Sequence, residues 1–286
     1  MSVTEATSPQ PVGRAIRGPA AVGGEWRRLL HLTRLLAVTE FRLRFFGSVL
    51  GYLWQVMHPL FLFGVLYVVF TEVVRLGGGV RFYPVALLAG VVLFVFLSES
   101  TSQSVQSLIE REPIVRKIQF PRLAVPLSIV LTALFRLALN LLVVFVFLLI
   151  SGGGVRLSWL ELPVLLALMV VLAAGLAALL SALFVHFRDV KPIWDVLLQV
   201  MFYATPIFYP ITIVKSETLR ELLMLNPFAA ILQEFRHAVI DASHPSAADA
   251  IGGGIRLLIP LGLIALIAVV GFRYFDRKAP RIAEEL

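Results

Sequence analysis

The sequence predicts an all-α integral membrane protein. We expect six transmembrane helices, an N-terminal amphipathic interface helix, and short re-entrant external helices before the last span. Hydrophobic residues fill 59% of its 286 positions and charged residues only 15%. The mean hydropathy of +0.89 is far above that of soluble globular proteins. Because lipid cannot satisfy open backbone groups, apolar runs of this length are expected to be helices.

Several classes of chemistry find no support in the sequence. Cysteine is absent, and the five histidines show no metal-ligand spacing. None of the lysines follows a glycine, so the chain lacks the phosphate-binding loop of nucleotide hydrolases. The usual zinc-protease and serine-hydrolase motifs are also missing. We therefore expect no catalytic residues, no metal and no cofactor on this chain.

The N-terminal region divides into a tail and a surface helix. Residues 1–25 carry Pro, Gly and Ser without an apolar core, which indicates a disordered cytosolic tail rather than a signal peptide. The transmembrane domain is expected to cover 26–286 and to begin with an interface helix over 26–46. Arg27, Arg34 and Arg42 lie on one side of that helix and apolar residues on the other. A cytosolic helix that packs its own apolar face is the alternative.

The six spans are bounded by the nearest charged residues. They are predicted at about 48–71, 82–108, 123–150, 160–187, 194–214 and 255–274. Most Lys and Arg residues then fall on the side that holds both termini, so the positive-inside rule places the termini in the cytosol. The long external connection contains two segments that could each form a short helix, Ser216–Leu225 and the quite apolar Pro227–Ile240, and we expect them to be re-entrant. A loose linker, Asp241–Gly254, should follow.

The cytosolic segment Glu110–Arg122 is unusually rich in charge for this chain. Pro113 suits a first helical turn, and Phe120-Pro121 should end the helix. An ordinary loop and an element that docks on a soluble partner both fit these residues. The charged and flanking residues concerned are Glu110, Glu112, Pro113, Ile114, Arg116, Lys117, Phe120, Pro121 and Arg122.

A polar stripe follows one face of the second span. Glu99, Gln103, Gln106 and Glu110 recur at helical spacing. The stripe either walls a hydrated path or marks a helix that outruns the bilayer. Glu99 and Arg136 lie at similar depths from the cytosolic loop, and a lone charge there is costly, so we predict that they pair or share a wet cavity.

Aromatic residues crowd the first and fifth spans. Ring faces offer apolar surfaces along which sugars can slide, although aromatic residues are also common at membrane interfaces. With the polar stripe, the candidate substrate-path residues are Tyr52, Trp54, Glu99, Gln103, Gln106, Arg136, Tyr203 and Tyr209.

Several stretches, in order, resemble the membrane subunit of ABC-2-type exporters of the polysaccharide and polyol-phosphate branch. They are Arg44-Phe-Phe-Gly-Ser-Val-Leu-Gly-Tyr-Leu-Trp54 with Pro59, Glu112–Arg122, Arg188-Asp189, Thr205-Pro-Ile-Phe-Tyr-Pro210 and Asn226-Pro227. The resemblance covers roughly Trp26 to the C-terminus. It implies a homodimer in the bacterial cytoplasmic membrane, paired with two copies of a separate ATPase that holds ATP and Mg.

The resemblance also implies roles for particular residues. The surface helix and the Glu110–Arg122 loop would transmit nucleotide-driven motion, and the external helices would gate the outer mouth. A lipid-linked glycan such as O-antigen or teichoic acid would enter beside Arg27, Arg34, Arg42 and Arg44, which attract its phosphate or hold anionic lipid head groups. An exporter of drugs or small lipids is the first alternative. A membrane-embedded glycan-lipid transferase is the second, although it would need clustered acidic or histidine residues that the sequence lacks.

Overall fold

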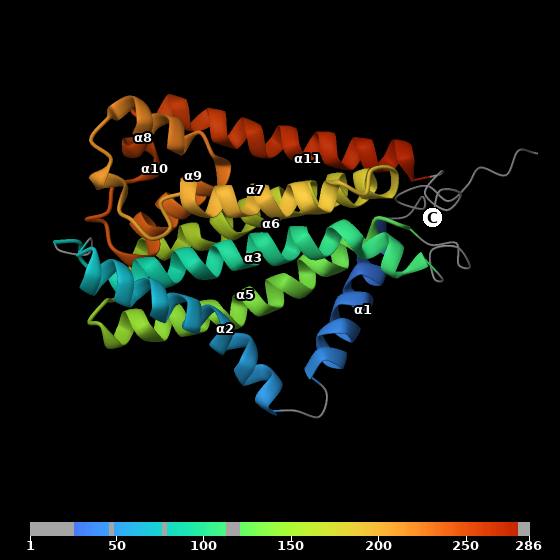
Figure 1. Cartoon of the computed structure of the whole chain (residues 1–286), viewed down its shortest axis with the longest axis horizontal. Coiled ribbons are helices and arrows are strands. Elements are labelled where there is room, and N and C mark those ends of the chain that lie inside the picture. Colours follow the sequence, from blue (N-terminus) through green and yellow to red (C-terminus); the bar gives the residue numbers. More distant parts are fainter. Residues whose placement is uncertain (1–25, 46–48, 76–78, 113–120, 280–286) are drawn as a thin grey trace, which may run out of the picture.

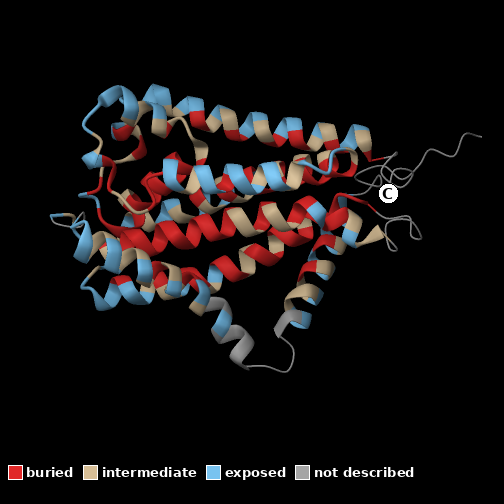
Figure 2. Ribbon diagram, viewed as in Figure 1, coloured by how far each residue is buried: buried red, intermediate tan, exposed pale blue. Residues whose placement is uncertain are grey.

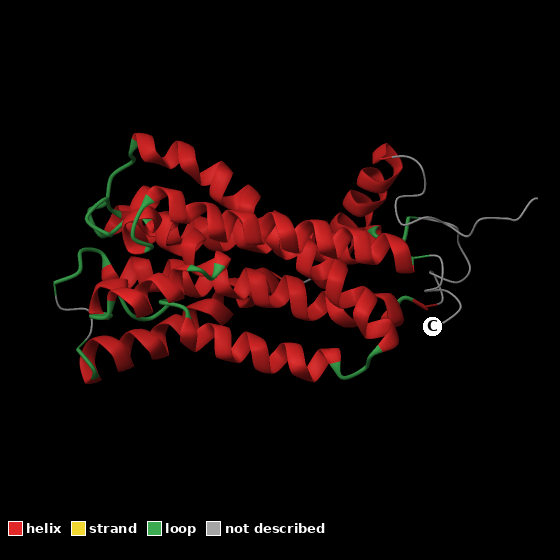
Figure 3. Cartoon of the chain, turned by 90° about the horizontal axis from the view of Figure 1, so that it is seen from above, coloured by secondary structure: helices red, strands yellow, loops and turns green. Residues whose placement is uncertain are grey.

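The structure is a computed structural model that describes residues 26–45, 49–75, 79–112 and 121–279, with side chains except at 44–53, 55 and 56. No strand occurs within these residues, which confirms the all-α class (Figure 3). The longer helices are α1 (Trp26–Phe45), α2 (Val49–Tyr67), α3 (Tyr83–Glu110), α5 (Ala124–Ile150), α6 (Leu162–His186), α7 (Val190–Ala204) and α11 (Leu258–Lys278). Helices α3, α5, α6, α7 and α11 run roughly along the long axis of the molecule, whereas α1 and α2 slant away from it (Figure 1).

Shorter elements connect the long helices. The π-helix η1 (Val68–Val73) continues α2, and η2 (Leu157–Glu161) leads into α6. The remainder lie between α7 and α11: η3 (Ile211–Ile213), α8 (Glu217–Met224), α9 (Pro227–Phe235), η4 (Arg236–Ile240), α10 (Ala247–Ala250) and η5 (Gly254–Leu257). We call α8, α9, η4 and α10 the helical cap, because they gather at the end of the bundle opposite the C-terminus (Figure 1).

Within the described residues, four helical stretches are long and apolar enough to cross a membrane. They are Tyr83–Glu110, Ala124–Ile150, Leu157–His186 and Gly254–Lys278. They match the second, third, fourth and sixth predicted spans. At the position of the first span, the apolar stretch Met57–Val73 belongs to α2 and η1, which together run from Val49 to Val73.

The fifth predicted span differs from the helix that occupies its place. Helix α7 begins at Val190 and ends at Ala204, with 15 residues, whereas the predicted span runs over 194–214. Thr205 has extended backbone angles (φ −85°, ψ 143°). It precedes Pro206, and a residue before proline is driven out of the helical region. The aromatic segment that follows is therefore not helical.

The centre of the bundle is α3, whereas α11 lies at its edge. In its most apolar window α3 is 83% buried and α11 only 17% (Figure 2). Helix α11 packs on α6 through small residues, since a Cβ on Gly271 would overlap the carbonyl oxygen of Gly175 and a Cβ on Gly175 would lie 2.7 Å from the Cα of Ala268. Close backbone approach of this kind is how helices associate without a hydrophobic driving force.

The helical cap confirms the predicted pair of short helices. Ser216 caps α8 by accepting a hydrogen bond from the Leu219 amide at 3.3 Å. Asn226 caps α9 by accepting from the Phe228 amide at 3.0 Å, with Pro227 in the first turn. The predicted loose linker is partly wrong, because it contains α10. Ser246 and Asp249 form a reciprocal capping box there, so a short helix is stable in a Ser- and Ala-rich segment.

Candidate functional site

A buried ion pair joins α3 and α5 inside the bundle. The Nη1 atom of Arg136 lies 2.6 Å from Oε2 of Glu99, and their side chains are 5% and 23% exposed. This contact confirms the predicted pairing of the two charges. A pair at this depth is far less costly than either charge alone, since a charge in the membrane core needs a partner or water.

A second set of polar side chains lies where α7 meets α3. Lys191 donates to both carboxylate oxygens of Asp195, at 2.6 and 2.7 Å, and to the Ser102 hydroxyl at 2.7 Å. The Ser102 hydroxyl donates to Asp195 at 3.0 Å, and the Trp194 indole donates to the Thr101 hydroxyl at 3.0 Å. The two helices are thus held together by polar contacts in an otherwise apolar bundle.

The polar residues of α7 continue along its exposed side. Lys191, Asp195, Gln199 and Tyr203 follow each other at i, i+4, i+8 and i+12, which is one face of a helix. Asp195, Gln199 and Tyr203 are exposed. We call these four residues the α7 polar face. Sequence reasoning missed it, because the fifth span was begun at 194 and Lys191 was counted with the cytosolic loop; the spacing of these four residues was the available signal.

A polar cavity of about 290 Å³ lies beside this contact, near the ends of α3 and α1. Its lining brings together three residues of the predicted stripe, Gln103, Gln106 and Glu110, with Ser102 and Lys191. Glu40 of α1 and Arg111 also line it and form an ion pair with each other. The stripe therefore borders a cavity rather than packing against apolar side chains alone.

The predicted aromatic path residues fall in different places. Trp54 and Tyr203 are 68% and 60% exposed. Tyr209 is half-buried, and its hydroxyl donates to the carbonyl of Ala204 at 3.1 Å. The side chain of Tyr52 lies outside those described. Tyr203 packs edge-on against Phe208, with ring centroids 6.1 Å apart, so the end of α7 does carry an aromatic cluster.

The predicted coupling segment is described only at its two ends. Pro113, Ile114, Arg116, Lys117 and Phe120 lie outside the described residues. At the near end Glu110 is exposed and Glu112 is half-buried.

The far end of the segment is buried. Pro121 is buried, and Arg122, 3% exposed, donates from Nη1 to the carbonyl oxygen of Ala279. This arginine ties the start of α5 to the end of α11, a contact between positions far apart in the sequence.

The surface helix α1 packs on α5 by one face. Leu29 and Ala37 are fully buried, and Phe41 meets Phe135 edge-on with centroids 5.7 Å apart. Of the four predicted phosphate-attracting arginines, Arg27, Arg34 and Arg42 are exposed. The fourth, Arg44, has a side chain outside those described.

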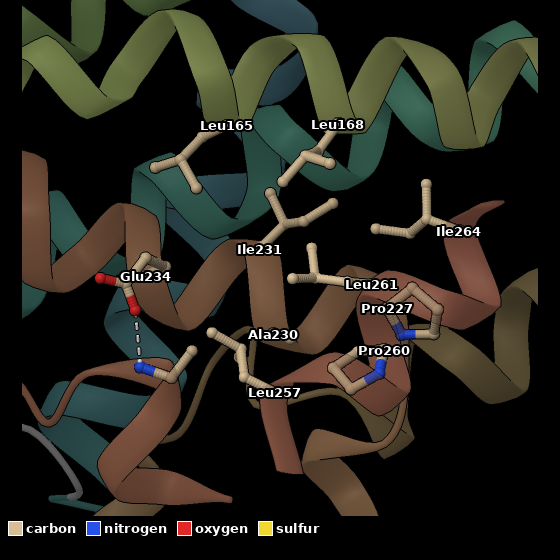
Figure 4. A pocket seen from close by; sticks show the side chains of 11 residues that line it. Leu165, Leu168, Pro227, Ala230, Ile231, Glu234, Leu257, Pro260, Leu261 and Ile264 are labelled. Atoms are coloured by element: carbon tan, nitrogen blue, oxygen red, sulfur yellow. Dashed lines mark hydrogen bonds between the residues drawn. The ribbon is translucent and has the colours of Figure 1, made fainter. Parts of the chain in front are cut away.

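An apolar pocket of about 60 Å³ lies between α6, α9 and α11 (Figure 4). Leu165, Ile231 and Leu261 are among its lining residues. Glu234 points to one side, where its carboxylate accepts a hydrogen bond from the amide of Ala247 at 2.8 Å. With its one carboxylate engaged, this pocket offers no converging polar groups for a charged ligand.

Among the described residues, no group of three or more His, Asp or Glu residues is placed to hold a metal ion. What the bundle does offer is membrane-crossing helices with charged and amide side chains between them. This combination defines a multi-pass membrane protein with polar groups in its interior, as transport proteins have.

The chain belongs to the ABC-2 type transporter family, whose model matches residues 31–240. It is 28% identical over 259 residues to an O-antigen export system permease protein RfbA of Klebsiella pneumoniae, covering 90% of this chain and 96% of that protein. It is 27% identical over 256 residues to the protein of the same name in Myxococcus xanthus, covering 88% and 94%. Membership of a transporter family makes the chain a transport subunit rather than an enzyme.

Proposed function

We propose that this chain is the transmembrane subunit of an ATP-driven exporter that moves a lipid-linked polysaccharide across the bacterial cytoplasmic membrane. The observation that carries the proposal is the α7 polar face, which leaves Asp195, Gln199 and Tyr203 exposed on a helix of the membrane bundle. Polar side chains in such a position need water or protein rather than lipid. The export function printed for the relatives supports a glycan such as O-antigen as the cargo.

We propose that two copies of the chain form the path between them. If α7 of each copy faces the other, the polar faces line a shared channel and are withdrawn from lipid. The exposed rings of Trp54 and Tyr203 would then offer sliding surfaces for sugars, and Gln103 and Gln106 would wall the cytosolic approach. The proposed path also includes Tyr52, Tyr209, Glu99 and Arg136.

The proposed topology keeps six spans, with both termini in the cytosol. Four of these spans are the full-length helices. The other two are formed by α2 together with η1, and by α7 together with the non-helical segment after it. Helix α1 would lie in the cytosolic membrane surface, and its exposed Arg27, Arg34 and Arg42, with Arg44, would attract the phosphate of the incoming lipid-linked substrate. The helical cap then lies on the outer side.

ATP and Mg are proposed to bind a separate ATPase subunit, two copies to the dimer. The segment Glu110–Arg122 would dock on it, with Glu112, Arg116 and Lys117 at the contact. Arg122 would act differently from the others, because its buried contact with Ala279 can pass movement of the segment to α11.

The test is to purify the tagged chain from native membranes in mild detergent and to assay the complex for ATP hydrolysis. We expect an ATPase subunit to co-purify, and the double charge reversal R116E/K117E to release or uncouple it. The exposed Arg277 at the end of α11 provides a control, R277E, that should leave the complex intact. Recovery of the chain alone under every condition would refute the proposal.

A further inference from the structure

A cavity of about 270 Å³ lies at the helical cap, away from the α7 polar face. Arg81, Thr212, Gln233, Arg236, Ser243 and His244 are among the residues that line it. A water molecule takes up about 30 Å³, so the space is large enough for a small polyatomic ligand with accompanying water.

Three of these lining side chains are buried and have polar atoms without a partner. Arg236, Gln233 and His244 are 4%, 1% and 7% exposed. Their Nε, Oε1 and Nε2 atoms, respectively, make no hydrogen bond in the described part of the chain. Buried polar atoms are nearly always paired, so three unpaired ones around a single cavity point to a ligand that pairs them.

The free atoms define what that ligand must offer. The two Nη atoms of Arg236 are committed to backbone carbonyls, at 2.6 Å from Pro206 and 2.6 Å from Ile207, so its Nε remains as a charged donor. Gln233 uses its Nε2 to donate to the carbonyl of Pro245 at 2.6 Å, which leaves Oε1 as an acceptor.

His244 contributes a second acceptor. Burial, and then the charge of Arg236, lower the pKa of His244 to about 4, so its ring is neutral at pH 7. The Nε2 atom of the ring has no hydrogen-bond partner in the described part of the chain. In the neutral tautomer with the proton on Nδ1, Nε2 carries a lone pair that can accept a hydrogen bond from the ligand.

The surroundings carry an excess of positive charge. The Asp241 carboxylate contacts two arginines, since its Oδ2 lies 2.7 Å from Arg156 and 3.3 Å from Arg81. Burial alone would raise the pKa of Asp241, but hydrogen bonds from Ser243 and Arg156 outweigh it and hold the pKa below its usual value. One ionised carboxylate thus faces three arginines, counting Arg236. The Arg81 side chain lines the cavity and is 63% exposed, so it can bind a ligand there in addition to Asp241.

We propose that this cavity binds a phosphate group that carries a hydroxyl, either as inorganic hydrogen phosphate or as a phosphate beside a glycerol hydroxyl in a lipid head group. The phosphate oxygens accept from the guanidinium groups of Arg236 and Arg81, and the hydroxyl donates to Gln233 or His244. A neutral sugar would satisfy the acceptors but leave the charge unmatched. A sulfate ion would match the charge but has no hydrogen to donate.

The assignment rests on the geometry of the cavity and does not depend on the proposed export function. Its test therefore uses binding as the readout. The chain is purified into nanodiscs of phosphatidylcholine, inorganic phosphate is titrated at constant ionic strength, and the thermal unfolding midpoint is followed, since a ligand that binds only the folded state raises it. We expect a saturable rise with phosphate and a much smaller one with sulfate.

Two variants make the test specific. R81Q should weaken phosphate binding at least about ten-fold, because it removes a charged hydrogen-bond donor, and it should fold because Arg81 is largely exposed. The matched control is R256Q. Arg256 has a 50% exposed side chain and one carboxylate partner, Glu221, but does not line the cavity. It should bind phosphate as the unaltered chain does.

A second arm separates the two sources of phosphate. Nanodiscs that contain phosphatidylglycerol should stabilise the chain and compete with added phosphate if a lipid head group occupies the site, and R81Q should abolish both effects. Binding in either arm that R81Q weakens and R256Q does not supports the proposal. An equal response to sulfate would overturn the roles given to Gln233 and His244. No R81Q-sensitive response in either arm would overturn the site.

Discussion

Two buried arginines in different regions of the molecule are stabilised in different ways. Arg136, in the interior of α5, and Arg236, in the helical cap, are each 4% exposed. Arg136 meets a carboxylate, since its Nη1 lies 2.6 Å from Glu99. Arg236 meets backbone oxygens, of Pro206 and Ile207 at 2.6 Å and of Ala86 at 3.4 Å.

The contact of Arg136 with a side chain can be exchanged for another partner, whereas the contact of Arg236 with backbone carbonyls is fixed by the fold. A side-chain pair can open when a helix moves and close on water or another partner. The backbone carbonyls of Pro206 and Ile207, after α7, and of Ala86, in α3, are fixed by the fold. They cannot leave Arg236 unless the packing of these segments against the helical cap is disrupted. Burial lowers the pKa of Arg236 to about 10, against the raising effect of Tyr83 and Tyr209, so the charge persists at pH 7.

The largest expected effect comes from removing the carbonyl-bound arginine. R236L should destabilise the fold by about 4 kcal/mol, since each short hydrogen bond to a charged group contributes roughly 1.5–3 kcal/mol and the freed carbonyls stay buried. The measurement is the free energy of unfolding in SDS titration. Neutralising an acidic residue should not restore the stability of R236L, because losing Arg236 leaves no carboxylate unpaired. If removing any single acidic residue did restore it, Arg236 would be paired with a carboxylate as Arg136 is.

The next effect comes from the side-chain pair. R136Q should cost about 3 kcal/mol, because it leaves the Glu99 carboxylate without its partner inside the bundle. The double variant E99Q/R136Q should recover most of that loss, since two amides can hydrogen-bond without charge. If the double variant proved as unstable as R136Q alone, Arg136 would be stabilised by something other than Glu99.

The contrast between these arginines also marks what the sequence could reveal. The Glu99–Arg136 pair was predictable, because both are lone charges in apolar runs at similar depth, and an isolated charge there demands a partner. The short helices of the cap were predictable from Asn226-Pro227, whose capping chemistry is local. The four full-length spans followed from long apolar runs with at most one formal charge in their interior.

The remaining features depend on contacts between distant positions. Arg236 was expected only as one residue of the predicted short helix Pro227–Ile240. Its hydrogen-bond partners lie 30, 29 and 150 residues away, and no local pattern predicts them. The buried contact of Arg122 could not be predicted for the same reason, because the carbonyl that it binds is 157 residues along the chain. Lys191 was left outside the predicted fifth span, which began at 194, because charge alone fixes the start of a helix poorly.

A smaller effect tests the neighbourhood of Arg236 without touching the charge. The Tyr83 hydroxyl donates to the carbonyl of Phe208 at 2.6 Å, beside the carbonyls that Arg236 binds. Y83F should cost about 1 kcal/mol, as expected for one neutral hydrogen bond. The same SDS titration measures it. A loss as large as that of R236L would mean that the aromatic segment is held mainly by Tyr83, and the arginine would not be the principal tie.

Substitution in the α7 polar face should have the smallest effect on stability but a large effect on transport. Asp195 is 48% exposed, so its pair with Lys191 resembles a surface ion pair, and D195N should change the free energy of unfolding by less than about 1 kcal/mol. If two copies enclose the path, the same change alters a charge that the cargo passes, and glycan export from cells should fall. D276N, at the exposed Asp276 of α11, is the matched control and should leave both quantities unchanged. Normal export by D195N would mean that the path lies elsewhere. The contacts of Asp195 with Lys191 and Ser102 would then be purely structural, like the contacts of Arg236 with backbone carbonyls.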